Sequence, residues 1–236
     1  MPPADASLGI VADLWRFPVK SFGGERLRRA FVGPFGLLGD RRFAVSAGAE
    51  PATARRTPGL LAFRAEYRDG ESAGSPTVIA TDGTGFAPLD PALANAVGDS
   101  IGQDVVVAQS PIGFFDAAPL HILGEPSIQA LSDGVGTELD RRRFRANILV
   151  EPAAGAAFEE DAWLGQRLEI GGAVVEIVVN TERCAVTTFD PDTLERDPRV
   201  LRALAETREN LFGVYARVIR PGWVATGDAV RPSPTG

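Results

Sequence analysis

The sequence predicts a β-rich α+β protein made of two strand-rich halves. Short apolar runs separated by Gly, Pro and Asp recur along the 236 residues, and this spacing is typical of strands joined by turns. Only two segments keep a helical period. Hydrophobic residues make up 44% of the chain, which is enough for a sizeable core. Many short strands with few helices favour β-barrels over a parallel α/β sheet.

The expected strands follow one another with turn residues between them. In the first half they cover 9–19, 27–32, 41–47, 60–67, 76–81 and 103–109. In the second half they cover 144–151, 167–179, 213–222 and 227–232. The Gly- and Ser-rich stretch 69–76 predicts a hairpin loop. The division between the halves is expected within 109–121, which gives domains 1–112 and 113–236.

Both expected helices lie in the second half. Segment 125–135 has Pro126 near its start and a glycine after its end, the residues favoured at these positions. Segment 197–210 spaces Val200, Leu201 and Leu204 along one face.

Composition and charge exclude several classes of protein. The chain carries 31 acidic against 24 basic residues, whereas a general nucleic-acid binder would be basic. No apolar stretch approaches the roughly 18 residues of a membrane span, and residues 1–15 lack the pattern of a secretory signal. A single cysteine cannot form an internal disulfide, which fits a reducing compartment. We therefore expect a cytoplasmic protein that binds neither nucleic acid nor membranes.

That cysteine, Cys184, has mostly polar neighbours in the segment NTERCAVTTFDPDT (180–193). An apolar strand would deliver the thiol to the strand's end, where loops begin and sites are commonly built. Arg183 beside it would favour the thiolate, which is the form that ligates a soft transition metal. A half-buried structural cysteine is the alternative that the local residues leave open. His121, the only histidine, is expected to be a packed residue, and the absence of a His/Cys cluster disfavours a zinc site.

The stretch TERCAVTTFDPDT (181–193) resembles the signature of MOSC domains, the family that includes the C-terminal domain of molybdenum cofactor sulfurases. It looks most like the branch containing the mitochondrial amidoxime-reducing component and its bacterial relatives. Further segments resemble that branch in the same order: 11–27, 36–45, 53–60, 124–131, 143–150, 157–171 and 210–230. The resemblance implies a MOSC N-terminal β-barrel-like domain followed by a MOSC β-barrel with a few helices. The chain departs from it at Leu194, where relatives commonly have glycine.

The resemblance also implies a molybdenum cofactor, in which a pyranopterin dithiolene holds the metal and Cys184 ligates it. The phosphate of such a cofactor requires cations and N–H donors, and its pterin requires mixed donors and acceptors. The matching segments offer Lys20, Ser21, Arg41, Arg55, Ser127, Arg145, Asn147 and Tyr215 as cofactor-binding residues. Arg145 and Asn147 are two apart on an expected strand and would point to the same side. Solvated surface charge is the alternative for the cations, and a simple helix cap is the alternative for Ser127.

The function implied is an oxidoreductase that reduces N-oxygenated small molecules at molybdenum. A single cysteine cannot hold a cysteine-ligated iron–sulfur cluster, so electrons would come from a separate donor protein. Two alternatives stay open. The chain could carry the cofactor without catalysis, or it could carry sulfur as a Cys184 persulfide.

Overall fold

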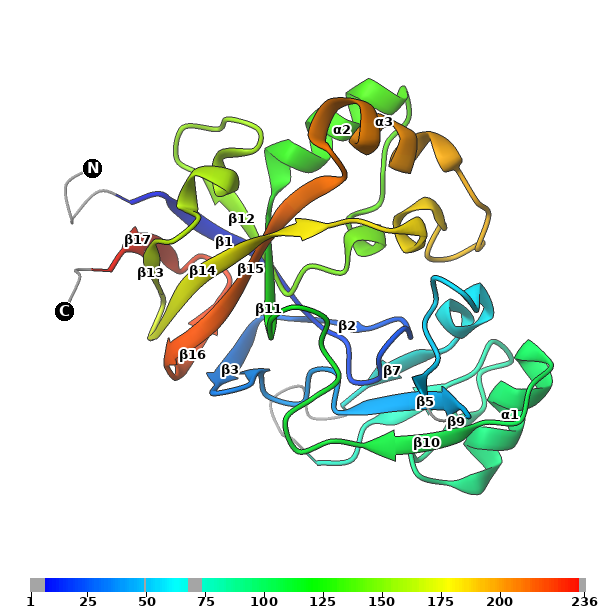
Figure 1. The fold of residues 1–236 in the computed structure, drawn as a ribbon. Helices are drawn as coiled ribbons and strands as arrows, with labels where there is room; N and C mark the ends of the chain where they lie inside the picture. Colours follow the sequence, from blue (N-terminus) through cyan, green and yellow to red (C-terminus); the bar gives the residue numbers. More distant parts are fainter. Residues whose placement is uncertain (1–6, 49, 68–73, 234–236) are drawn as a thin grey trace.

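The computed structural model describes residues 7–48, 50–67 and 74–233, and its largest element is a closed β-barrel (Figure 1). Seven strands follow one another in the order β12-β11-β15-β14-β13-β17-β1, and β1 pairs back with β12 to close the ring. β2 extends the sheet beyond β1. The strands are β1 (Gly9–Arg16), β2 (Glu25–Leu27), β11 (Leu120–Gly124), β12 (Ile148–Pro152), β13 (Arg167–Ile170), β14 (Ala173–Glu182), β15 (Leu211–Arg220) and β17 (Ala229–Pro232).

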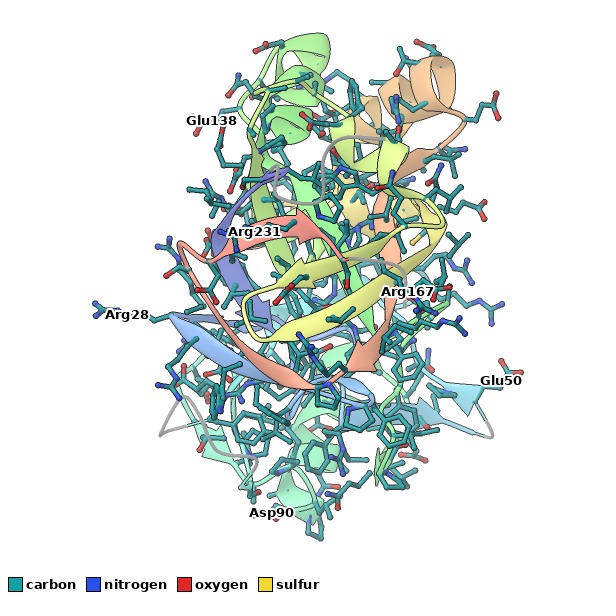
Figure 2. The ribbon with its side chains drawn as sticks, turned by 90° about the vertical axis from the view of Figure 1, so that its left-hand side faces the viewer. Arg28, Glu50, Asp90, Glu138, Arg167 and Arg231 are labelled. Carbon is teal, nitrogen blue, oxygen red and sulfur yellow. The ribbon has the colours of Figure 1, made fainter. Side chains whose placement is uncertain are left out.

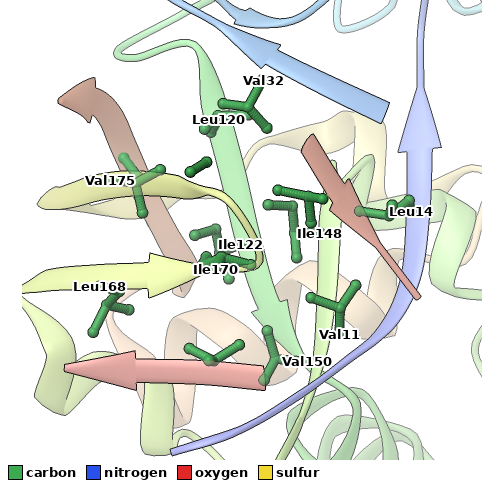
Figure 3. Close-up of a cluster of buried hydrophobic side chains, with 14 of the residues drawn as sticks. Val11, Leu14, Val32, Leu120, Ile122, Ile148, Val150, Leu168, Ile170 and Val175 are labelled. Carbon is green, nitrogen blue, oxygen red and sulfur yellow. The ribbon is translucent and has the colours of Figure 1, made fainter. Parts of the chain in front are cut away.

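The barrel draws on both ends of the chain, because β1 comes from the first half and the other six strands come from the second. Its interior is filled by apolar side chains, a number of which Figure 3 shows. Successive side chains of a strand point to opposite faces, so only every other one enters the interior. Ile122 and Ile148 face each other across a parallel pair and are fully buried. The predicted strand-rich fold class is confirmed. The division at residue 112 stays a prediction.

A second lobe, called here the N-terminal lobe, is built on the sheets β10-β5-β6 and β7-β8-β9 with helix α1 (lower part of Figure 1). Its own core includes Phe22, Leu60, Phe63 and Leu93. A further small sheet, β16-β3-β4, lies beside the barrel. The strands outside the barrel are β3 (Arg29–Gly33), β4 (Gly36–Leu37), β5 (Phe43–Ala47), β6 (Glu50–Pro51), β7 (Arg64–Glu66), β8 (Thr77–Ile79), β9 (Gly85–Phe86), β10 (Val106–Gln109) and β16 (Gly222–Ala225).

The described residues also form three α-helices and four short 3-10 helices. α2 occupies the predicted range, and α3 is shorter than predicted by a few residues. The helices are α1 (Pro91–Ile101), α2 (Glu125–Val135), α3 (Pro198–Arg208), η1 (Pro58–Ala62), η2 (Arg141–Phe144), η3 (Glu159–Trp163) and η4 (Ala185–Thr188). α2 and α3 pack together over one side of the barrel.

The expectation of only two helices is wrong, because α1 is a third. Asp90 caps it by accepting from the N–H of Ala92, and Gly102 ends it in the left-handed conformation. Its apolar stripe consists of only Leu93, Val97 and the partly buried Ile101, diluted by small and polar residues. This dilution is why the helical period is hard to see in the sequence.

Several predicted strands differ from the observed ones. Residues 27–32 fall in two strands, 60–67 begin as η1, 144–151 begin as η2, and 167–179 fold as the β13–β14 hairpin. Gly171 supplies the left-handed turn of that hairpin. The predicted hairpin loop 69–76 lies mostly outside the described residues, although the flanking strands β7 and β8 do pair antiparallel.

Charged side chains such as Arg28, Glu50 and Asp90 project outward from the molecule (Figure 2). Within the described ranges, none of the helices has both the length and the apolar character that a membrane crossing requires. After β14 ends at Glu182, the chain turns through η4 on the side of the barrel that faces the N-terminal lobe (Figure 1). Cys184 therefore lies where the two lobes meet.

Candidate functional site

A cavity of about 770 Å³ lies between the barrel and the N-terminal lobe beside Cys184. The N-terminal lobe, the connection before β11, and strands β14 and β15 all contribute to its lining. Seven of the residues predicted from the sequence line it together: Lys20, Ser21, Arg41, Arg55, Arg145, Cys184 and Tyr215. The structure thus brings into one place residues that are far apart in the chain.

Cys184 stands at the start of η4, two residues beyond the end of β14, as the sequence predicts. Its carbonyl accepts from the backbone N–H of Thr187 (3.1 Å) and from the Thr187 hydroxyl (3.0 Å), which fixes the backbone. The side chain is half-buried on the cavity wall. In the described part of the chain no three His, Cys, Asp or Glu side chains are grouped to hold a metal.

The loop after Cys184 is held by arginines of η2. Arg143 donates to the Asp190 carboxylate (2.9 Å) and to the carbonyl of Thr188 (3.1 Å). Asp190 also accepts from the backbone N–H groups of Asp192 and Thr193, which shapes the turn. These bonds set the position of η4 and therefore of the thiol.

Leu194, the departure from the family pattern, has φ of +59°, in the left-handed region that favours glycine. The turn therefore keeps a glycine-like backbone without a glycine. Leu194 and the preceding residues Pro191–Thr193 line a second cavity of about 440 Å³, which Arg145 also borders.

Arg145 and Arg183 are half-buried cations, each with a buried nitrogen atom, and they lack a carboxylate partner among the described residues. Arg145 donates to the Phe22 carbonyl (2.6 Å) and lies 4.3 Å from the centre of the Phe17 ring, while its Nη2 has no partner. Arg183 donates to the Phe144 carbonyl (2.8 Å), and its Nε has no partner. Burial lowers the pKa of Arg183 and brings that of Arg145 down to about 9. Both stay protonated at neutral pH, so the cavity wall holds positive charge with N–H donors to spare.

Arg41 is held differently from these two. Its guanidinium pairs with Asp40 and donates to Asn147 Oδ1 (3.3 Å) and to the carbonyl of Arg145 (3.2 Å). Burial is the largest single influence and opposes its charge, but Asp40, Tyr215 and Asp116 together outweigh it and raise the pKa of Arg41. Arg41 is therefore a fixed cation at the cavity wall.

Asn147 does not line the cavity but positions residues that do. It is fully buried; Oδ1 accepts from the His121 N–H (3.2 Å) as well as from Arg41, and Nδ2 donates to the Trp15 carbonyl (3.2 Å). The expectation that Arg145 and Asn147 share one strand face is wrong. Both precede β12, and Arg145 ends η2 with φ of +54°.

Ser127 lies outside the cavity lining. Its buried hydroxyl donates to Glu160 (2.9 Å) and accepts from the backbone N–H of Phe158 (2.7 Å), which ties α2 to η3. α2 begins after Gly124 without any side-chain cap, so Ser127 is not the cap either. Its hydroxyl is already engaged on both sides, and we do not assign it to a ligand.

Lys20, Ser21 and Arg55 form the wall contributed by the N-terminal lobe. Lys20 Nζ donates to Asp116 (2.6 Å) and to the Phe114 carbonyl (3.0 Å). The Ser21 hydroxyl accepts from the N–H of Ala54 (3.0 Å), which holds the Arg55 loop against it. Arg55 is exposed, so its cation faces both the cavity and solvent.

Three further residues of the lining were not proposed as ligands from the sequence. Arg183 was noted only as a neighbour of the thiol. Asn180 has a buried Oδ1 without a partner, on an irregular part of β14 where the pairing register shifts. His121 packs 5.3 Å from the Tyr215 ring centre with Nε2 unpartnered, and burial keeps its pKa well below the ordinary value. In the sequence, only the motif NTERC pointed to Asn180 and Arg183. Whether a polar atom has a hydrogen-bond partner depends on residues far along the chain, so it cannot be read from the sequence.

Comparison with protein families identifies the family of the chain. The model of the MOSC domain matches residues 109–231, and that of the MOSC N-terminal beta barrel domain matches residues 8–94. The chain belongs to the MOSC domain family.

Curated relatives point to molybdenum cofactor proteins. The chain is 28% identical to a molybdenum cofactor sulfurase of Caenorhabditis briggsae, over 96% of this chain and 36% of that protein. It is 32% identical to mitochondrial amidoxime reducing component 2 of Rattus norvegicus, over 50% of this chain and 38% of that protein. The chain is 25% identical to human mitochondrial amidoxime-reducing component 1, over 94% of this chain and 82% of that protein. The chain thus matches little more than a third of the length of the first two relatives.

Among solved structures, the YUAD protein from Bacillus subtilis superposes with a TM-score of 0.51 at 14% identity. The match covers 94% of this chain and 93% of that one. At this identity the likeness concerns the fold alone.

Proposed function

We propose that this protein is a molybdenum-dependent oxidoreductase that binds a molybdenum cofactor in the cavity beside Cys184, with the Cys184 thiolate as the ligand from the protein. The observation that carries the proposal is the juxtaposition of that thiol with the unpartnered, buried N–H groups of Arg145 and Arg183. Leaving such donors unsatisfied is costly, and an anionic ligand would satisfy them. Family membership and the relatives named for molybdenum cofactor chemistry support the same assignment.

The residues present fit a cofactor with a phosphate, a pterin and a soft metal. Arg145, Arg183 and Arg41 would bind its anionic and polar parts through charge-assisted hydrogen bonds. Asn180 Oδ1 would accept a hydrogen bond from a pterin N–H. Lys20 would contribute once its pair with Asp116 opens or is shared. When bound, the cofactor would supply a two-electron metal centre for removing oxygen from substrate.

The substrates we propose are N-oxygenated small molecules, in line with the amidoxime-reducing names of two relatives. The overall reaction joins an N-hydroxylated compound, two electrons and two protons, and it yields the N–H compound and water. Because Cys184 is the only cysteine of this chain, we assign the electrons to a separate redox protein. The protein's own residues hold the reactants and keep the cavity positively charged.

The proposal is tested by the molybdenum and pterin content of protein made in a host that synthesises the cofactor. We expect about one molybdenum atom per chain in the wild type and little in Cys184→Ser, because the thiolate is the one protein ligand we assign. Equal molybdenum in both would contradict the assignment.

Turnover separates an enzyme from a carrier. Loaded protein mixed with reduced viologen and benzamidoxime should oxidise the dye, and Cys184→Ala should abolish the activity. Full loading without turnover across a panel of N-hydroxylated compounds would favour a cofactor carrier instead.

A further inference from the structure

A second cavity, of about 440 Å³, lies where the two lobes meet and is separate from the cavity beside Cys184. Its walls include residues of β1, η1 and β7 and the turn Pro191–Leu194. Of their lining residues, the two cavities share only Arg145. The proposed function uses no other residue of the second cavity.

Among the charged side chains that line this second cavity, Arg145 is the one without a carboxylate partner in the described part of the chain. Arg64 pairs with Glu66 (2.7 Å), and Arg142 pairs with Asp192 (2.6 Å). Arg145 donates only to a backbone carbonyl, and its Nη2 has no hydrogen-bond partner. An anion beside Arg145 would supply the missing counterion through charge-assisted hydrogen bonds.

The uncharged part of the lining is mostly apolar and includes two aromatic rings. The Arg145 guanidinium lies 4.3 Å from the centre of the Phe17 ring. The indole N–H of Trp15 donates to Asp13 (3.1 Å), which fixes the second ring. Further apolar side chains of the lining are Leu61, Ala62, Pro191 and Leu194. One cation at the edge of an apolar, aromatic cavity suits a ligand with one negative charge and an aromatic body.

Leu194 adds its side chain to this wall although its backbone is unfavourable for leucine. Its φ of +59° lies in the left-handed region, where glycine meets no steric penalty and other residues do. Backbone conformations of this kind gather at ligand sites. A leucine kept in such a conformation at a cavity wall supports a binding role for the cavity.

We propose that the second cavity binds a small aromatic carboxylate, whose anionic end pairs with Arg145 while its ring lies against Trp15 and Leu194. The volume of the cavity is in the range of small-molecule sites. A monophosphate fits less well, because it carries nearly two charges and three acceptor oxygens. The inference is independent of the molybdenum assignment, since Cys184 does not line this cavity.

Calorimetry with naphthoate, and with naphthamide as the neutral ligand of similar shape, tests the inference on the full chain. We expect the wild type to bind naphthoate about tenfold more tightly than naphthamide, because only the acid pairs with Arg145. Arg145→Met should remove this preference and leave naphthamide binding nearly unchanged. The preference in the wild type is measured without a substitution, so it decides the matter even where a variant does not fold.

The same substitution at one apolar residue of each cavity locates the ligand. Leu194→Glu places a carboxylate on the wall of the second cavity and should weaken naphthoate binding at least about tenfold, because like charges repel. Val179→Glu, on the wall of the first cavity, is the control and should bind like the wild type. Cys184→Ser should also bind naphthoate normally.

Equal affinities of the wild type for naphthoate and naphthamide would overturn the inference. So would an unchanged naphthoate affinity in Arg145→Met. Weaker binding in Val179→Glu with normal binding in Leu194→Glu would place the ligand in the first cavity and overturn it as well.

Discussion

Arg143 and Arg145 are two residues apart in one turn of the chain, yet their surroundings are opposite. Arg143 pairs with Asp190, and its neighbour Arg142 forms bonds to Asp140 and Asp192 that raise the pKa of Arg142. Arg145 donates only to a carbonyl, and burial lowers its pKa to about 9. Paired cations such as Arg143 hold the fold. Each of the two arginines has one buried nitrogen without a partner, so the difference lies in the carboxylate that only Arg143 has. A largely desolvated cation without a carboxylate costs stability by itself, which fits the role in ligand binding that we propose for Arg145.

The largest effect we expect comes from removing an unpaired cation. Arg145→Met keeps a similar volume and removes the charge, so cofactor retention should fall by roughly ten- to a hundredfold. Stability of the cofactor-free protein should stay equal or rise, because a half-buried charge without a carboxylate partner is replaced by an apolar side chain. Pterin content after dialysis and the melting temperature of the cofactor-free form measure the two effects.

Opposite signs in those two measurements are the signature of a residue kept for binding. A large fall in melting temperature together with normal retention would place Arg145 with the structural arginines instead.

Removing an arginine that pairs with a carboxylate should lower the stability of the protein. Arg143→Ala removes the ion pair to Asp190 and one of the two hydrogen bonds to the Thr188 carbonyl, so the free energy of unfolding should fall by about 2 kcal/mol. Urea unfolding at neutral pH measures it. The exposed Arg202→Ala on α3 is the control and should change little. An equal loss in both variants would show that the Asp190 pair contributes nothing specific.

The ion pair between Arg143 and Asp190 should also make the stability of the folded state depend on pH. Burial opposes the ionisation of Asp190, but its bonds to the Thr193 and Asp192 N–H groups and the charge of Arg143 lower its pKa overall. A depressed carboxyl pKa stabilises the folded state above the unfolded value, and this stabilisation is lost as the pH falls through the folded value. The difference between wild type and Arg143→Ala should therefore shrink below about pH 4. A difference that stays constant to pH 3 would contradict the ion-pair explanation.

A substitution at Leu194 should have a smaller effect on stability, and it tests how firmly Arg142 and Arg143 hold the turn that contains this residue. Leu194 keeps φ of +59°, and a β-branched side chain tolerates this region worse than leucine does. Leu194→Val should lower the free energy of unfolding by about 1 kcal/mol. Leu164→Val, at a half-exposed leucine with φ of −53°, is the matched control and should cost less. Equal costs would mean that the turn relaxes.

The smallest effect concerns Lys20, a cavity cation that already pairs with a carboxylate. Asp116→Asn removes the carboxylate from Lys20, so inorganic phosphate should bind the cofactor-free protein several-fold more tightly, the scale of an exposed ion pair. Calorimetry at low ionic strength measures this, and the gain should fade with added salt. Unchanged phosphate affinity would exclude Lys20 from the anion site.

Local features of this molecule could be predicted from the sequence better than features that depend on distant residues. The end of β14 before Cys184 follows from an apolar run and a polar break, and α2 follows from its proline and glycine signals. The left-handed turn at Arg145 and the engagement of Ser127 by Glu160 depend on segments far along the chain. The unpartnered atoms of Asn180 and Arg183 become visible only when every neighbour is in place.

The central claim is that Cys184 binds molybdenum in a cavity whose wall includes two cations without a carboxylate partner, Arg145 and Arg183. Because the chain has one cysteine, growth on selenocysteine would place a single selenium atom at this position and nowhere else. X-ray absorption at the molybdenum edge of the loaded protein should then show one selenium neighbour that is absent from the sulfur form. Bound molybdenum without a selenium neighbour would contradict the claim.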